Sequence, residues 1–281
     1  NVWLKNQLFL TVRYVRTGMV GYRDSLQDQW GYLLLDPVDT RRRLLKTLSH
    51  MMADGSCPRQ YSLLDDQHDL RRFMDSGTWI ALPLTRYIAE TGETAFLEEE
   101  IPYLRSDKTE SVEAHAWKAL DLLYSQRGRH GLCLTGDGDW NDALEGISRC
   151  GDAESAWLTM ALFQAQNLMA DLYDHVNQPV KRDELRQRSV TLKRLLNEHA
   201  WDGDWYVYGF TGTGKPIGSS KNREGRIHLN AQTWAIFTGI ADPEQTRRMR
   251  QAIREHLDTP VGPALLSPPY VHEAAEVGRI A

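Results

Sequence analysis

The sequence has little cysteine and no long apolar stretch. Its 281 residues include three cysteines, Cys57, Cys133 and Cys150, with no C-x-x-C pair among them. Disulfide frameworks and zinc sites normally need paired cysteines, so we expect neither of them, and we expect no other metal centre. The cysteine content indicates a reducing, cytoplasmic location. The longest apolar runs are much shorter than the length of about 18–20 residues that is needed to cross a bilayer, so no membrane partner is expected.

Long basic runs are also missing. The net charge is −5, and the densest basic clusters, Arg41–Arg43 and Arg247–Arg248, are typical of solvated helix faces. This pattern excludes the basic surfaces that bind nucleic acid. Residues 1–5 lack the basic region of a signal peptide and an initiator methionine, so we interpret the chain as a fragment of a longer protein.

The sequence contains no P-loop, no dinucleotide-binding glycine motif and no Gly-x-Ser-x-Gly elbow. Strands and helices do not alternate, which argues against a parallel-sheet enzyme. Hydrophobic periodicity instead predicts an all-α fold, either a globular bundle or a closed ring of helical hairpins, with one small β-hairpin near residues 204–218. Helices are predicted over about 2–16 (mostly buried), 22–36, 39–55, 76–92, 109–123, 152–172, 181–200, 231–239 and 244–257, with Asp39, Ser76, Thr109 and Asp152 as proposed starts.

Nine tryptophans and eleven tyrosines are present, and acidic residues concentrate in one segment, Thr135–Gly146. Its twelve residues hold four carboxylates and three glycines. Carboxylates this close together repel one another, so we expect the segment to have a function that outweighs this cost. A cation site, a sugar site and general acid catalysis are the three candidates.

The spacing of the acids argues against a calcium loop. Asp137, Asp139 and Asn141 alternate as calcium ligands do, but glycine does not fall at the sixth position and Glu145 comes too early. Glycoside cleavage, in contrast, needs one carboxylic acid to protonate the leaving oxygen. An inverting hydrolase needs a second carboxylate about 6.5–9.5 Å away, whereas a phosphorylase uses inorganic phosphate as the nucleophile.

A second polar segment lies at Gly18–Asp28. Asp24, Gln27 and Asp28 are spaced i, i+3 and i+4, so they share one face of the predicted helix. Their position at a helix start leaves simple capping as an alternative to a binding role. Asp75 and Ser76 likewise precede a predicted helix and could cap it.

Three segments together resemble the family 94 glycoside phosphorylases. Gly136-Asp-Gly-Asp-Trp-Asn-Asp142 is similar to the family's Gly-x-Gly-Asp-Trp-Asn-Asp-Gly signature. Gly21-Tyr-Arg-Asp-Ser-Leu-Gln-Asp28 and Gly225-Arg-Ile-His-Leu-Asn-Ala-Gln-Thr-Trp-Ala235 match two further family motifs, in the family's order. The three motifs span almost the whole chain.

The resemblance implies an (α/α)6 barrel in which residues 1–281 form a single, incomplete catalytic domain. The family's N-terminal β-sandwich and the last part of the barrel would lie outside it. The implied reaction is phosphorolysis of a β-linked gluco-oligosaccharide with inversion, giving an α-sugar 1-phosphate. The implied roles are general acid for Asp142 and substrate binding for Arg23, Asp24, Gln27, Trp140, Asn141 and Asp137. Asp139 and Asp137 are expected to keep Asp142 protonated by charge repulsion.

The chain departs from the family pattern at two places. Ala143 replaces a glycine, and the sequence stops shortly after Gly278-Arg-Ile280, before the family's Lys/Arg-Glu-Asn-Gly-Gly segment. Phosphate-binding residues are expected beyond Ala281, so the fragment is not expected to be active alone.

The expected partners are a β-glucoside and inorganic phosphate as co-substrate, with no cofactor. The full-length form could be a homodimer. Three alternatives stay open: a cyclic β-glucan synthase module, an inverting hydrolase using Asp24 as base, and a non-catalytic sugar- or calcium-binding module. The sequence does not specify the linkage or the acceptor sugar.

Overall fold

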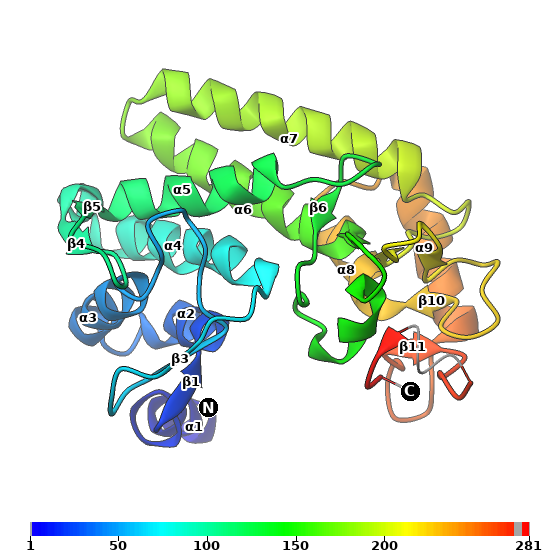
Figure 1. Ribbon diagram of the computed structural model, residues 1–281, viewed down its shortest axis with the longest axis horizontal. Coiled ribbons are helices and arrows are strands. Elements are labelled where there is room, and N and C mark those ends of the chain that lie inside the picture. The colour runs from blue at the N-terminus through cyan, green and yellow to red at the C-terminus, as the bar shows by residue number, and fades with distance from the viewer. Residues whose placement is uncertain (1, 273–276, 281) are drawn as a thin grey trace. The chain divides into compact units, whose positions relative to one another are not determined.

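The protein is predominantly helical in the computed structural model of Figure 1, which describes residues 2–272 and 277–280. Within these residues it has nine α-helices and eleven short strands. The chain divides into two compact units, Asn1–Ser125 with Ala165–Leu185, and Gln126–Gln164 with Arg186–Ala281. Two long helices, α6 (Ala156–His175) and α7 (Pro179–His199), contribute residues to both units.

The first unit contains five helices of its own and two small sheets. The helices are α1 (Val2–Leu10), α2 (Tyr22–Tyr32), α3 (Pro37–Leu48), α4 (Ala81–Thr91) and α5 (Val112–Ser125), with a π-helical turn η1 (Thr11–Val15) and 3-10 helices η2 (Met74–Ile80) and η3 (Thr94–Glu98). An antiparallel sheet joins β1 (Met19–Gly21), β2 (Gln60–Ser62) and β3 (His68–Asp69). A hairpin joins β4 (Glu100–Pro102) and β5 (Thr109–Ser111).

The helices lie close to where the periodicity places them, but several begin or end at other residues, and α3 ends at Leu48 and not near residue 55. Asp36, not Asp39, caps α3, because its side chain accepts from the Asp39 backbone N–H and Pro37 takes the first helical position. Thr109 lies in a strand, and Ser111 caps α5 by accepting from the Ala114 N–H. Ser76 lies inside η2 rather than at its start.

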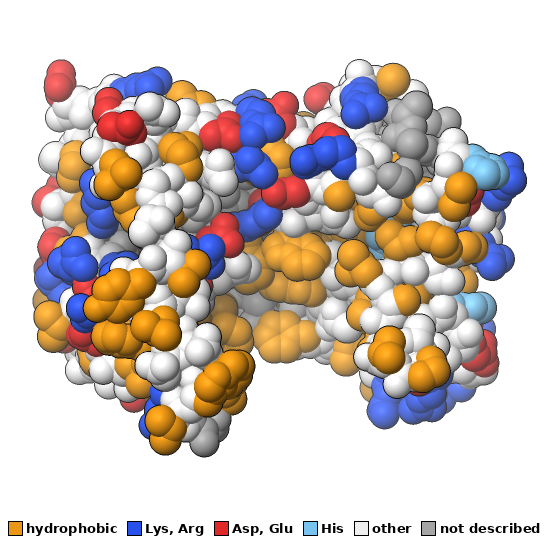
Figure 2. Space-filling model, turned by 90° about the horizontal axis from the view of Figure 1, so that it is seen from below, with side chains coloured by type: hydrophobic (Ala, Val, Ile, Leu, Met, Phe, Trp, Pro, Cys, Tyr) orange, Lys and Arg blue, Asp and Glu red, His pale blue; other side chains and the backbone are white. Residues whose placement is uncertain are grey.

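The prediction that the first helix is mostly buried is wrong. No residue of α1 is buried, and Trp3 and Leu4 are 68% and 58% exposed. Figure 2 shows hydrophobic side chains gathered on the surface of the first unit. The apolar residues of α1 do not form a stripe on one side of the helix, so periodicity could not decide which face is covered.

The second unit is built around a four-stranded antiparallel sheet. Its strands are β6 (Cys133–Leu134), β7 (Glu154–Ser155), β8 (Gly209–Phe210) and β9 (Pro216–Ile217), hydrogen-bonded in that order. The predicted hairpin is confirmed as β8–β9. The expected start of α6 at Asp152 is wrong, because β7 intervenes and Ser155 caps the helix through the Leu158 N–H.

The rest of the second unit carries the third motif. It includes η4 (Asp142–Ser148), a two-stranded sheet of β10 (Ile227–His228) and β11 (Leu266–Ser267), α8 (Leu229–Phe237) and α9 (Pro243–His256). Gln232 on α8 is fully buried, and its amide bonds both the backbone N–H and the backbone carbonyl of Tyr206. A buried cluster that includes Trp205, Tyr206 and Met249 forms the core. No helix of the described residues is long and apolar enough to cross a membrane.

Two buried histidines make stability depend on pH. Burial lowers the pKa of His50 and of His228 to about 4, and the charge of Lys46 adds to the effect at His50. Unfolded histidine titrates near about 6.5, so between pH 6.5 and 4 the unfolded chain binds more protons than the folded one.

We therefore expect the free energy of unfolding to fall as the pH drops from 6.5 towards 4. Each histidine should contribute a loss of up to about 3 kcal/mol. Urea titrations between pH 4 and 8 measure this, and His50→Gln should flatten the slope below pH 6.5. An unchanged slope in that variant would contradict the assignment to His50.

Candidate functional site

The acidic segment forms a tight loop between β6 and η4 in the second unit. Gly136 takes a φ of +60°, and the Gly138 N–H donates to the Thr135 carbonyl at 3.1 Å. The loop ends where the Asn141 side chain accepts from the Ala143 N–H and caps η4. Asp142 is therefore the first residue of a 3-10 helix, and its side chain is half-buried.

The carboxylates of this loop have different surroundings. Asp137 is exposed, whereas Asp139 is only 2% exposed. Oδ1 of Asp139 accepts from the Asn141 N–H at 3.0 Å and from the Tyr208 hydroxyl at 2.6 Å. The buried Asp139 carboxylate thus stabilises the conformation of the loop.

Trp140 belongs to a row of three indoles. Its ring centroid lies 6.0 Å from that of Trp157, and Trp157 contacts Trp234 edge-on at 5.3 Å. Trp157 is buried, at 1% exposed, while Trp140 is half-buried. A partly exposed indole fixed by buried neighbours is suited to packing against the apolar face of a sugar ring.

Asn141 carries a buried polar atom that points to a ligand. The residue is 8% exposed, and its Nδ2 has no hydrogen-bond acceptor among the described residues. A buried donor without an acceptor is costly, so such groups often bind a ligand or water.

The last described residues pack against η4. The Ile280 N–H donates to the Ala143 carbonyl at 3.0 Å, and Nη2 of Arg279 donates to the Asp142 carbonyl at 3.0 Å. Arg279 also pairs with Glu145. Gly278 makes this approach possible because a Cβ there would lie 2.7–2.8 Å from Glu145, Ala143 and Gly146.

Gly278→Ala is expected to separate this segment from η4. The substitution adds a clash with backbone atoms to the strain of a φ of +107°, so it should cost about 2–3 kcal/mol. Gly262→Ala is the matched control, since Gly262 has a φ of +119° and nothing within 4 Å of the added Cβ. Thermal melts and hydrogen exchange of residues 142–148 would compare the two, and equal losses would contradict the packing role of Gly278.

The first unit positions Arg23 by a buried ion pair. Arg23 Nη1 lies 3.0 Å from Oδ2 of Asp75, which is fully buried and also accepts from the Trp79 indole N–H at 3.0 Å. Asp75, which the sequence suggests as a possible helix cap, instead fixes the position of the predicted sugar-binding arginine. Arg23 is on α2 and Asp75 on η2.

Asp24 and Asp28 share a helical face, as their spacing predicts. Arg16 contacts both, at 3.6 Å from Asp24 and 2.8 Å from Asp28. The Asp24 carboxylate lies against Gly21, where a Cβ would come within 1.8 Å of Oδ2. Gln27 is half-buried on the same helix.

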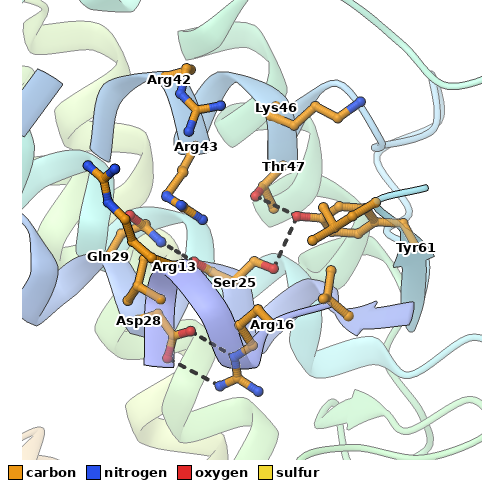
Figure 3. Close-up of a pocket in the computed structure, with 13 residues that line it drawn as sticks. Arg13, Arg16, Ser25, Asp28, Gln29, Arg42, Arg43, Lys46, Thr47 and Tyr61 are labelled. Atoms are coloured by element: carbon orange, nitrogen blue, oxygen red, sulfur yellow. Dashed lines mark hydrogen bonds and ion pairs between the residues drawn. The ribbon is translucent and has the colours of Figure 1, made fainter. Parts of the chain in front are cut away.

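A cavity of about 210 Å³ lies beside α2 (Figure 3). None of Arg23, Asp24 and Gln27 lines it. Its lining includes Arg13, Arg16, Ser25, Asp28, Gln29, Arg42, Arg43, Lys46, Thr47 and Tyr61. Each of these arginines approaches an acid. Arg16 pairs with Asp28, and Arg13, Arg42 and Arg43 all approach the single carboxylate of Asp39.

The family model described as the glycosyl hydrolase 94 superfamily, catalytic domain, matches residues 1–281. The chain belongs to glycoside hydrolase family 94. It is 38% identical over its whole length to a solabiose phosphorylase and 35% identical to a 3-O-beta-D-glucopyranosyl-beta-D-glucuronide phosphorylase, both from Paenibacillus borealis. It covers 36% and 37% of those relatives, so this family 94 chain spans little more than a third of their length.

A solved structure also shares the fold of this family 94 chain. A rhamnosidase from Klebsiella oxytoca with rhamnose bound superposes with a TM-score of 0.65, covering 93% of this chain and 47% of the rhamnosidase. The identity is 17%, so the likeness is one of fold alone.

The motifs identified the loop but not the residues that support it. The motifs did not point to Tyr208, which bonds Asp139, or to Arg279, which bonds the Asp142 carbonyl. Tyr208 stands in an aromatic stretch, Trp205–Phe210, that indicated only strand propensity. The sequence signal that could have found Tyr208 is the alternation of Tyr206 and Tyr208 beside a glycine-rich turn.

Proposed function

We propose that the protein carrying this chain catalyses inverting phosphorolysis of a β-linked gluco-oligosaccharide. The observation that carries the proposal is the family match over the whole chain, together with relatives named as phosphorylases. The fold proposed for the catalytic domain is an (α/α)6 barrel that includes residues 1–281.

In the proposed reaction, Asp142 is the general acid. An oxygen of hydrogen phosphate bonds to the anomeric carbon as the glycosidic bond breaks, and the electron pair passes to the leaving oxygen. That oxygen takes the proton of Asp142, and the proton of the phosphate later restores the acid. The products are an α-sugar 1-phosphate and the shortened saccharide.

The remaining residues of the motifs are proposed to bind the sugar. Trp140 would stack on a ring, Asn141 would donate its unpaired Nδ2–H, and Asp137, exposed in the same loop, would accept from a hydroxyl. Arg23, Asp24 and Gln27 are proposed as further polar contacts. Repulsion from the other carboxyls of the loop, Asp137 and Asp139, is proposed to favour the protonated form of Asp142.

The test uses the full-length protein with inorganic phosphate and β-linked disaccharides. The panel includes solabiose and 3-O-β-D-glucopyranosyl-β-D-glucuronide, the substrates in the names of the two relatives. Phosphorus NMR should show an α-sugar 1-phosphate that forms only when phosphate is present. Release of free glucose at the same rate without phosphate would instead support an inverting hydrolase and overturn the proposal.

A further inference from the structure

A tyrosine outside the three motifs is bonded to the loop of the proposed general acid. The Tyr208 hydroxyl donates to Oδ1 of Asp139 at 2.6 Å, and both side chains are buried, at 0% and 2% exposed. The same oxygen accepts the Asn141 N–H, one peptide before Asp142. The contact thus joins the β-hairpin to the acid loop across 69 positions of sequence.

Tyr208 is itself held by its backbone on both sides. Its N–H donates to the Ile217 carbonyl at 2.7 Å, and its carbonyl accepts from the Ala156 N–H at 2.9 Å. Two residues earlier, the buried amide of Gln232 bonds the N–H and the carbonyl of Tyr206. Gly218 lies so close that a Cβ there would be 2.8 Å from the Tyr208 nitrogen.

We propose that Tyr208 is a positioning residue for the proton donor, acting on Asp142 through Asp139 and the Asn141 peptide. This inference rests on the proposed role of Asp142. A general acid works only within about 2.6–3.2 Å of the oxygen that it protonates. A loop held at a buried carboxylate by a rigid tyrosine keeps the donor within that narrow range, whereas a loop free to shift would lose it.

Tyr208→Phe removes the hydroxyl and preserves the ring. We expect kcat for a β-linked disaccharide to fall about 10- to 100-fold, the range for losing a hydrogen bond to a buried charged group, with KM changed less than about threefold. With 2,4-dinitrophenyl β-D-glucoside the loss should stay below about threefold, because that leaving group departs without a proton.

Tyr206→Phe is the matched control. Tyr206 is also fully buried on the same segment, but its hydroxyl bonds Asn197 on α7 and Gln245 on α9, neither of which belongs to the acid loop. It should cost similar stability and leave the ratio of rates on the two substrates unchanged. Equal losses on both substrates in Tyr208→Phe, or the same behaviour in both variants, would overturn the inference.

A second measurement relies on the disaccharide alone. If Tyr208 acts through Asp142, adding Tyr208→Phe to Asp142→Asn should cost little further activity, because residues that act as one unit are not additive. A full additional loss in the double variant would show a general structural role and overturn the inference. Failure of the proposed function is distinct, since the unmodified protein would then form no sugar 1-phosphate.

Discussion

Asp142→Asn is expected to lower kcat for phosphorolysis of a β-linked disaccharide by about 10²–10⁴-fold, the usual contribution of a general acid. Asparagine keeps the size and the polarity of the side chain, so η4 and its cap should stay intact. KM should change little, because protonation of the leaving oxygen develops only in the transition state. Initial rates of sugar 1-phosphate formation measure the effect.

The leaving group separates a lost proton donor from a damaged site. On 2,4-dinitrophenyl β-D-glucoside, Asp142→Asn should keep most of its activity, since dinitrophenolate needs no proton to depart. Asp152→Asn is the control, because Asp152 is an exposed acid beyond η4. Full activity of Asp142→Asn on the disaccharide would refute the assignment of Asp142 as the general acid.

The sequence brings out the candidate loop more clearly than the residues that support it, for a physical reason. One short segment contains Asp137, Trp140, Asn141 and Asp142. Its high density of acidic residues can be recognised from the sequence alone. The residues that support this loop and the predicted sugar-binding Arg23 come from distant positions. Tyr208 bonds Asp139 across 69 residues, and Asp75 bonds Arg23 across 52. Such pairs depend on tertiary contacts, which local patterns do not encode.

The secondary structure shows a similar limit. Long helices such as α6 and α7 were predicted because many residues share one period. Strands of two or three residues, such as β6 and β7, carry too little alternation to be recognised, and the sequence therefore revealed one hairpin of a four-stranded sheet. α3 begins at Pro37 and not after Asp39, because Asp36-Pro37 is a strong signal for the start of a helix.

The second large effect is expected at the ion pair in the first unit. Asp75→Ala should lower the free energy of unfolding by about 3–5 kcal/mol, the usual cost of removing one partner from a buried pair. Asp75 is fully buried and Arg23 is 18% exposed on its side chain, so the arginine would keep its charge without its carboxylate. The Trp79 indole N–H would lose its acceptor as well.

Asp75→Asn separates these two losses. The amide oxygen can still accept from Trp79, but the charge opposite Arg23 is gone, so this variant should fall between the native protein and Asp75→Ala. Urea denaturation gives the free energies, and hydrogen exchange of residues 22–32 and 74–80 locates the change to α2 and η2. Asp107→Ala, at an exposed acid of the same unit, is the control and should stay within about 0.5 kcal/mol of the native protein.

The proposed role of Arg23 would connect this ion pair to sugar binding. If Arg23 binds sugar as proposed, Asp75→Asn should raise KM for the disaccharide by more than it lowers kcat, because it frees an arginine that binds ground state and transition state alike. An Arg23→Met, Asp75→Leu double variant should recover stability, since apolar groups of similar volume can replace a buried ion pair. It should not recover KM. Recovery of both would mean that Arg23 only supports the fold, whereas recovery of stability alone would assign it to the substrate.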